Sequence, residues 1–225
     1  MNDEGNVIGI ISATNLDRKG NNLVVRGTLP FFGKPIIELT YEALDYSKVK
    51  KIFVYTIKKG IVIKDILGKK VRYILKSNEY IYNNDVIQYD LINNFSSNQT
   101  IIFIDPKYPL IDSQLIDMFI NYHFDNNNDI SIIEGYYNGT IINPNIFITT
   151  VQIFNRLINN THEIFKHIDI NKIFEYNKNI NINVGVYKVE KIYNILSLTN
   201  LNLILNVESI FLKRKWRIIW LKISL

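Results

Sequence analysis

The feature that most constrains the fold is a short apolar run that ends in an aspartate and is followed by two prolines. Residues 101–104 read IIFI, a run that is too short for a helix and rich in β-branched side chains, so we expect a strand buried on both faces. Asp105 ends the run, and Pro106 and Pro109 prevent the chain from continuing as strand or helix. The sequence therefore predicts a tight loop over residues 105–111 at the carboxyl end of a central strand.

Asp105 has two interpretations at this position. Open α/β sheets bind ligands at the carboxyl ends of their strands, so a carboxylate there can contact a ligand. It can equally accept hydrogen bonds from its own turn. After the loop, Asp112 or Ser113 can cap a helix that ends near residue 124. The apolar stripe of this helix consists of Leu115, Ile116, Phe119 and Ile120.

The rest of the chain alternates between predicted strands and predicted helices. Strands are expected at 7–12, 51–56, 71–75, 101–104, 130–134 and 183–189, and helices at 36–44, 61–67, 85–95, 150–158 and 191–198. Gly68 should end the helix over 61–67. This alternation predicts an α/β fold with a doubly wound, mostly parallel sheet and right-handed crossovers.

Two segments do not follow the alternation. Residues 13–28 read as a long polar loop, and residues 30–35 (PFFGKP) as a turn. Residues 136–182 fit another strand and helix poorly, so we expect an inserted arm there. At 225 residues, the chain is predicted to form one domain over 1–225 that carries this arm.

Composition excludes several classes of protein. The chain has no cysteine, so it has no disulfide and no thiol nucleophile, and three histidines make a zinc enzyme unexpected. Residues 1–6 are polar and acidic, unlike a signal peptide, and no apolar run reaches the ~18 residues of a membrane span. We therefore expect a cytoplasmic protein without stable membrane insertion.

The net charge of +5 is modest, and the basic residues are spread along the chain. Such a charge suits a protein that handles an anionic small molecule, and it also suits one that binds nucleic acid. The chain lacks basic patches interleaved with aromatic residues, so a nucleic-acid partner is not expected.

Several cations near the N-terminus are candidate phosphate ligands. Lys34 lies in a Gly-Lys-Pro step at a predicted strand-to-helix junction, where free backbone N–H groups can also face a phosphate. Arg18, Lys19 and Arg26 lie in the preceding loop, and a triphosphate needs several converging cations. The alternatives are a turn with a solvated lysine and a charged surface loop. Asp105 can hold Mg²⁺ against the phosphates, because Mg²⁺ prefers one or two carboxylates plus phosphate oxygens.

Two other features are less specific. His162 and His167 lie five positions apart and so do not share a helix face, which indicates surface residues rather than catalytic ones. Residues 210–225 form an amphipathic basic helix if helical, with an apolar stripe that includes Trp216 and Trp220. That stripe can pack on the domain or across a homodimer, or it can lie on a membrane; its width favours packing on protein.

The chain resembles nucleotidyltransferases of the cytidylyltransferase type, which include acylneuraminate, spore-coat-polysaccharide and methylerythritol-phosphate cytidylyltransferases. Three segments carry the resemblance. Residues 11–38 are similar to the nucleotide loop and the Gly-Lys-Pro helix of the family, and residues 105–117 to its Pro-Leu substrate loop. Residues 183–187 (NVGVY) resemble the late strand that lines the acceptor pocket. The resemblance spans residues 7 to about 190 and implies a Rossmann-like nucleotidyltransferase fold.

The resemblance implies a role for each matching residue. The phosphates of CTP would be held by Arg18, Arg26 and Lys34, and the nucleotide would also contact Ser12, Ala13, Thr14 and Asp105. The acceptor would contact Tyr108, Asn183 and Tyr187, and Mg²⁺ would be held by Asp105 and Glu208. The expected reaction transfers CMP from CTP to a sugar or sugar acid and releases pyrophosphate. A homodimer is expected because the family is largely dimeric.

The sequence also departs from the family pattern. Thr14 and Leu16 replace small residues of the first loop, and Arg26 stands where the family has lysine. Glu208 is the one candidate for the second metal carboxylate. These departures leave a second hypothesis open, in which a catalytically degenerate copy binds a ligand or partner without turnover.

Overall fold

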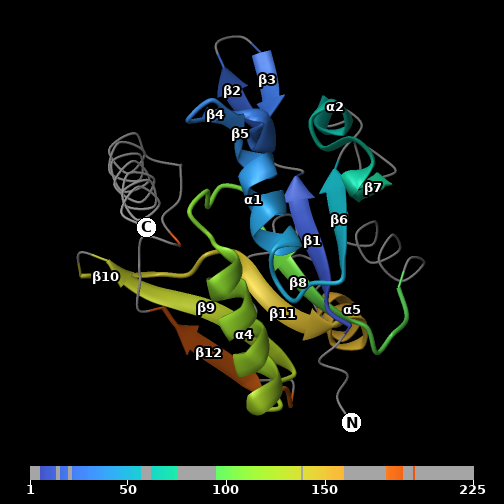
Figure 1. Ribbon diagram of the computed structural model, residues 1–225. Coiled ribbons are helices and arrows are strands. Elements are labelled where there is room, and N and C mark those ends of the chain that lie inside the picture. The colour runs from blue at the N-terminus through green and yellow to red at the C-terminus, as the bar shows by residue number, and fades with distance from the viewer. Residues whose placement is uncertain are drawn as a thin grey trace, which may run out of the picture.

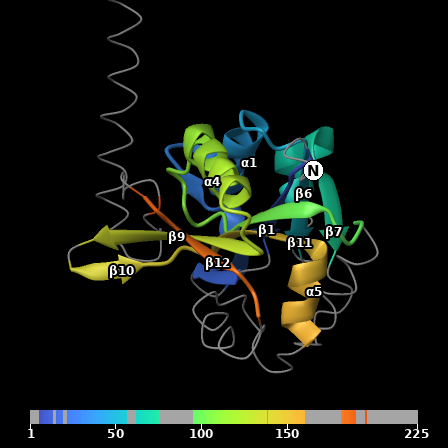
Figure 2. The same ribbon diagram turned by 90° about the horizontal axis from the view of Figure 1, so that it is seen from below.

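A central mixed sheet with helices on both faces forms the body of the protein. The computed structural model describes residues 6–13, 16–19, 22–56, 62–75, 95–137, 139–159, 181–189 and 195. Figure 1 shows the sheet, and the view in Figure 2 places α1 and α4 on one face and α5 on the other. The described helices are α1 (Ile36–Asp45), α2 (Ile63–Leu67), α4 (Ser113–Asp125) and α5 (Val151–Asn159).

Four neighbouring strands form the parallel part of the sheet. They are β8 (Thr100–Ile104), β1 (Ile8–Ala13), β6 (Lys51–Thr56) and β7 (Arg72–Leu75), in that order. All five residues of β8 are buried, as the apolar run predicts for a strand covered on both faces. The predicted strands over 7–12, 51–56, 71–75 and 101–104 are confirmed to within one residue at each end.

The other half of the sheet contains antiparallel pairs. Strand β11 (Ile146–Thr150) lies between β8 and β9 (Ile130–Tyr137) and runs antiparallel to both. The end of β9 also pairs with β10 (Thr140–Ile142), and β12 (Val184–Lys188) pairs parallel to β9. The fold is therefore the predicted α/β class with a mostly parallel sheet.

Part of the predicted arm over 136–182 belongs to the sheet instead. Phe147 of β11 stacks on Phe103 of β8 at 4.8 Å between ring centroids, and Phe154 of α5 stacks on Phe103 at 5.2 Å. Burial of these rings places one face of β11 and α5 in the core, which the short and interrupted pattern NPNIF did not indicate. The remaining stretch, 160–180, lies outside the described residues.

The predicted loop over 13–28 is also different in the structure. It contains a hairpin of β2 (Leu16–Lys19) and β3 (Asn22–Val25), followed by the 3₁₀ turn η1 (Arg26–Thr28). Lys19 pairs with Asn22, and the Gly-Asn step between them in the sequence is typical of a two-residue hairpin connection. These two strands were not predicted, because the charged residues hide the alternation of apolar and polar residues that is typical of a strand.

A second small hairpin leads into α1. Strands β4 (Pro30–Phe31) and β5 (Lys34–Pro35) are joined by Phe32 (φ 50°) and Gly33 (φ 75°). The tight two-residue turn that suits the right-handed twist of a hairpin needs a positive φ at both residues. Gly33 adopts a positive φ without steric cost. The predicted turn over 30–35 is thus confirmed and is a hairpin.

The helix predictions hold wherever the structure describes the residues. Asp112 caps α4, and its Oδ1 accepts a hydrogen bond from the Leu115 N–H at 2.9 Å. The predicted stripe of α4 is buried, and α2 ends at Gly68, whose φ is 56°. The predicted helices over 85–95 and 191–198 and the C-terminal run 210–225 lie almost entirely outside the described residues. Among the described helices, none is long and apolar enough to cross a membrane.

Candidate functional site

The candidate site lies where the parallel strands β1, β6 and β8 end together. Ser12 is in register with Tyr55, and Ile11 with Ile104, so Asp105 follows β8 beside Ser12 at the same sheet edge. The Thr56 hydroxyl donates a hydrogen bond to the Ala13 carbonyl oxygen at 3.1 Å and fixes the ends of β1 and β6 together. In Figure 1 the arrowheads of β1 and β6 point to this edge, on the side of the β2–β5 hairpins.

Asp105 is almost completely enclosed, with 4% of its surface exposed. Its Oδ1 accepts a hydrogen bond from the Lys107 N–H at 3.0 Å, which is the turn interaction that the sequence allowed. Its Oδ2 lies 3.6 Å from the Lys107 Nζ, whose side chain is 17% exposed. Asp105 is therefore a buried carboxylate with a cation already beside it.

Lys107 is a site residue that sequence reasoning missed. Its Nζ lies next to the carboxylate and 5.1 Å from the centroid of the Tyr108 ring. A partial signal was present in the sequence, because an aspartate that accepts from the N–H two residues later lies in the same turn as that residue. Lys107 thus adds a cation at the carboxyl edge, where anionic ligands of α/β folds bind.

The segment after the first hairpin returns to the Asp105 loop. A Cβ built on Gly27 would lie 3.2 Å from the Ile37 Cβ and 3.6 Å from the Pro106 Cγ. A larger residue at this position would press on α1, so glycine favours the close packing of η1 against α1 and Pro106. Arg26 precedes Gly27, so its backbone lies close to the Asp105 loop. The side chain of Arg26 is outside the described part.

Lys34 has a different partner from the one predicted. Its Nζ lies 2.7 Å from the Oε1 of Glu42, which is a residue of α1, and half of the lysine side chain is exposed. The hydrogen bond to Glu42 is the main cause that raises the pKa of Lys34. The Lys34 ammonium therefore lies against the surface of α1.

The two predicted acceptor tyrosines lie at the same end of the sheet but not together. Tyr108 is 4% exposed and belongs to the Asp105 loop. Tyr187 is in register with Ile133 on β9, and β9 and β11 separate it from β8. Its ring packs on α4 at 5.9 Å from Phe119 and 5.4 Å from Tyr122.

Asn183 lies at the opposite end of the sheet, so the structure does not bring it together with Asp105. It precedes β12 and is therefore level with Thr100 at the start of β8, five residues or about 16 Å from Asp105 along the strands. Its N–H donates to the Asp129 Oδ2 at 2.8 Å, and its Nδ2 donates to the Asn127 carbonyl oxygen at 3.2 Å. Asn183 fixes the turn between α4 and β9 instead.

Three other predicted site residues are not placed in full. Thr14 and Glu208 lie outside the described residues, and Arg18 is described in its backbone only, on β2 opposite Leu23. The described part of the chain thus brings Ser12, Ala13, Asp105 and Tyr108 to one edge, with the Arg26 backbone close by.

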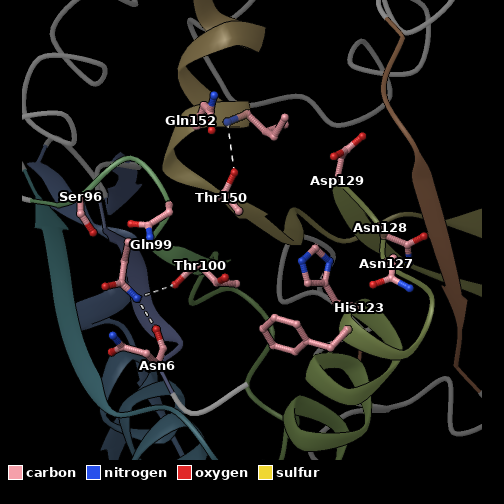
Figure 3. Close-up of a pocket in the computed structure, with 13 residues that line it drawn as sticks. Asn6, Ser96, Gln99, Thr100, His123, Asn127, Asn128, Asp129, Thr150 and Gln152 are labelled. Carbon is pink, nitrogen blue, oxygen red and sulfur yellow. Dashed lines mark hydrogen bonds between the residues drawn. The ribbon is translucent and has the colours of Figure 1, made fainter. Parts of the chain in front are cut away.

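A polar pocket of about 490 Å³ lies at the amino edge of the sheet, away from all of these residues except Asn183. Figure 3 shows that its side chains come from the start of β8, the end of α4 and the start of α5. Most carry amides or hydroxyls, among them Gln99, Asn127, Asn128, Thr150 and Gln152. The described lining contains no lysine or arginine, so it does not suit a phosphate group.

His123 is the buried group in the wall of this amide-lined pocket. Its Nδ1 is 2.9 Å from the Ser131 Oγ, which also accepts from the Asn128 Nδ2 at 3.1 Å. Burial lowers the pKa of His123 to about 4, partly offset by the Asp129 carboxylate. The imidazole is therefore neutral at pH 7, and Ser131, whose oxygen already accepts from Asn128, can donate to it.

The donor set at Asp105 suits Mg²⁺ in type and is minimal in number. Within the described ranges, no group of three or more potential metal-ligating side chains occurs. One buried carboxylate is nevertheless sufficient in sites where phosphate oxygens and water supply the remaining ligands. Asp105 would hold the ion, whose chemistry is to neutralise phosphate charge, once Lys107 moves from Oδ2.

Comparisons with known proteins agree on the fold. No protein-family model matches the chain, and no curated protein matches its sequence. Among solved structures, 4-diphosphocytidyl-2C-methyl-D-erythritol synthase from Anaerococcus prevotii superposes with a TM-score of 0.69 at 16% identity, covering 93% of this chain and 99% of that one. A nucleotidyl transferase from Methanothermobacter gives 0.68 at 14% identity, with 93% and 99% covered.

A third structure, CMP:2-keto-3-deoxy-manno-octonic acid synthetase complexed with CTP, gives a TM-score of 0.64 at 12% identity and covers 92% of this chain and 98% of that one. Each comparison extends over nearly the whole of both chains. The architecture implied by the sequence resemblance is thereby confirmed: the chain has the Rossmann-like fold of these nucleotidyltransferases.

Proposed function

We propose that the chain is a nucleotidyltransferase that transfers CMP from CTP to a sugar or sugar-acid acceptor and releases pyrophosphate. The observation that carries this proposal is the placement of Asp105. It is a buried carboxylate at the carboxyl end of a central parallel strand, beside the ends of β1 and β6. A CTP complex is known for one protein with this fold.

In the proposed reaction, an acceptor oxygen attacks the α-phosphorus of CTP. The new bond joins this oxygen to phosphorus, the bond to the bridging oxygen breaks, pyrophosphate leaves, and the acceptor proton passes to solvent. The protein contributes positioning and charge neutralisation rather than covalent chemistry. The edge that holds Asp105 supplies the place where both can occur.

Each part of the site has a role in this proposal. Ser12 and Ala13 present backbone groups to the nucleotide at the end of β1, and Tyr108 contributes to the acceptor side of the Asp105 loop. Arg18, Arg26 and Lys34 bind phosphates, for which Lys34 must leave Glu42. Lys107 adds a cation beside the carboxylate. Mg²⁺ bound by Asp105, with Glu208 as a second candidate ligand, would neutralise phosphate charge.

One observation favours the second hypothesis, a degenerate domain that binds a ligand or partner without turnover, in the version in which the ligand is a nucleotide. Both Asp105 oxygens are engaged by Lys107, through its N–H and its Nζ, so a metal ion has to displace a cation from Oδ2. In that case Lys107 replaces the metal, and the chain retains a ligand site without catalytic activity. The first loop, in which Thr14 and Leu16 replace small residues, agrees with this reading.

The experiment that separates the two hypotheses measures binding and turnover together. The protein is incubated with each nucleoside triphosphate, Mg²⁺ and a panel of sugar acids and sugar phosphates, and pyrophosphate is measured. Thermal unfolding in the same mixtures reports binding. Pyrophosphate release with CTP supports the enzyme, stabilisation by CTP without release supports the degenerate domain, and no response to any nucleotide contradicts both.

A further inference from the structure

A second pocket lies at the amino ends of β6 and β7, on the opposite edge of the sheet from Asp105. It has a volume of about 250 Å³. Its described wall contains five cations, which come from the start of β6, from η3 (Gly68–Lys70) and from the start of β7: Lys50, Lys51, Lys69, Lys70 and Arg72. We call it the basic pocket. In Figure 1 the amino end of β6 is the tail of its arrow, opposite the arrowhead that points to the candidate site.

The charge of the basic pocket is not neutralised within the described part of the chain. Asp45 is the one carboxylate in its described wall, and the Tyr41 hydroxyl forms a hydrogen bond with it. No described carboxylate forms an ion pair with any of the five cations. A concave site lined by one sign of charge concentrates the electrostatic field and attracts counter-ions.

Two of the cations contact aromatic rings that lie on opposite faces of the sheet. The Lys70 Nζ lies 5.6 Å from the centroid of the Tyr41 ring, and the Arg72 Cζ lies 5.9 Å from that of Phe53. All five cationic residues are exposed to solvent, and they line one pocket at the amino ends of the strands.

We propose that the basic pocket binds a small anion with two or more phosphate groups, such as pyrophosphate, tripolyphosphate or a bisphosphorylated metabolite. A single carboxylate or monophosphate needs fewer than five cations. An extended nucleic acid needs a stripe of cations along its backbone, whereas these residues enclose a volume of about 250 Å³. The proposal concerns a different sheet edge from that of the nucleotide site and does not depend on it.

The test measures binding of inorganic tripolyphosphate by calorimetry at low ionic strength, with EDTA present to exclude metal-dependent binding. The Lys69→Gln, Lys70→Gln double variant should weaken binding by about tenfold or more, because it removes two charged donors. The matched control is Lys48→Gln, Lys64→Gln, which removes the same charge outside the pocket. Lys64 is a close counterpart of Lys70, since its Nζ lies 5.2 Å from the Tyr73 ring. The control should bind within about twofold of the wild type.

Several outcomes would overturn the proposal. One is an equal loss of affinity in the pocket variant and in the control, which would indicate a general effect of net charge. Another is loss of tripolyphosphate binding only in Lys107→Gln, which would assign the anion to the nucleotide site. Tighter binding of a single-stranded oligonucleotide, or binding to phosphatidylinositol bisphosphate vesicles without binding of the free anion, would also contradict it. The Mg²⁺-dependent part of the stabilisation by CTP, measured in parallel, should be unchanged in the pocket variant, so failure of either proposal is recognised separately.

Discussion

Lys107 contacts both oxygens of the Asp105 carboxylate, through its N–H at 3.0 Å from Oδ1 and its Nζ at 3.6 Å from Oδ2. The carboxylate is 4% exposed, so it would be costly to leave it charged without this partner. A phosphate ligand offers Lys107 a second anion, and a metal ion offers Asp105 a second cation. The pair is therefore the point at which ligand binding, metal binding and stability are coupled.

A double-mutant cycle on this pair measures the coupling. Lys107→Met alone leaves a buried carboxylate without its cation and should reduce the free energy of unfolding by about 1–3 kcal/mol. Asp105→Asn, Lys107→Met should be more stable than the sum of the two single changes predicts, by about 1 kcal/mol. Urea denaturation at pH 7 of all four proteins gives the values. Additive effects would show that the Nζ contact contributes nothing to stability.

The metal hypothesis predicts a specific effect of Asp105→Asn on nucleotide binding. The amide keeps the hydrogen bond from the Lys107 N–H but removes the charge that would hold Mg²⁺. In the wild type, CTP at a hundred times its Kd should stabilise the fold by about 2.7 kcal/mol, and this stabilisation should require Mg²⁺. In Asp105→Asn, the stabilisation by CTP should no longer depend on Mg²⁺. Melting temperatures with CTP, with and without Mg²⁺, provide the measurement. An unchanged Mg²⁺ dependence in Asp105→Asn would remove Asp105 from the metal site.

The strands and helices around Asp105 could be predicted because each is specified locally. The run at 101–104, the Asp112 cap and the Gly68 stop depend on neighbouring residues, and the structure confirms all three. The mostly parallel order followed from the alternation of elements. Predictions failed where distant contacts decide, as for β11, which is held in the core by Phe103 and Phe154.

The candidate site was predictable only in part for the same reason. Ser12 and Asp105 meet because two predicted parallel strands end in register. Asn183 does not lie beside them, and its place could not be predicted because the sequence does not show at which end of the sheet β12 begins. One strand length separates the two ends. The basic pocket joins residues from β6 and β7 that carry no motif, so only the folded chain brings them together.

His123 predicts a pH dependence of stability. Its pKa in the folded protein is lowered to about 4, below the ordinary value of 6.5, so the unfolded chain binds the additional proton more readily. The contribution of the neutral imidazole is fully present above pH 6.5 and is lost as the pH falls from 6.5 toward 4, to a limit of roughly 3 kcal/mol. His123→Gln should reduce this slope between pH 7 and pH 4.5 in urea denaturation. Parallel curves for the two proteins would show that other groups cause the acid sensitivity.

Gly185 lies beneath the Asn128 side chain and predicts a steric coupling between β12 and the α4–β9 turn. A Cβ on Gly185 would lie 2.0 Å from the Asn128 Nδ2, so Gly185→Ala must displace that amide and break its hydrogen bond to Ser131. The expected loss is about 1–3 kcal/mol of unfolding free energy. Asn128→Ala removes the obstacle, so adding Gly185→Ala to it should cost less than about 0.5 kcal/mol. Chemical denaturation of the two single variants and the double variant measures these free energies. If Gly185→Ala lowers the unfolding free energy of Asn128→Ala by as much as that of the wild type, glycine is required by the strand backbone and not by contact with Asn128.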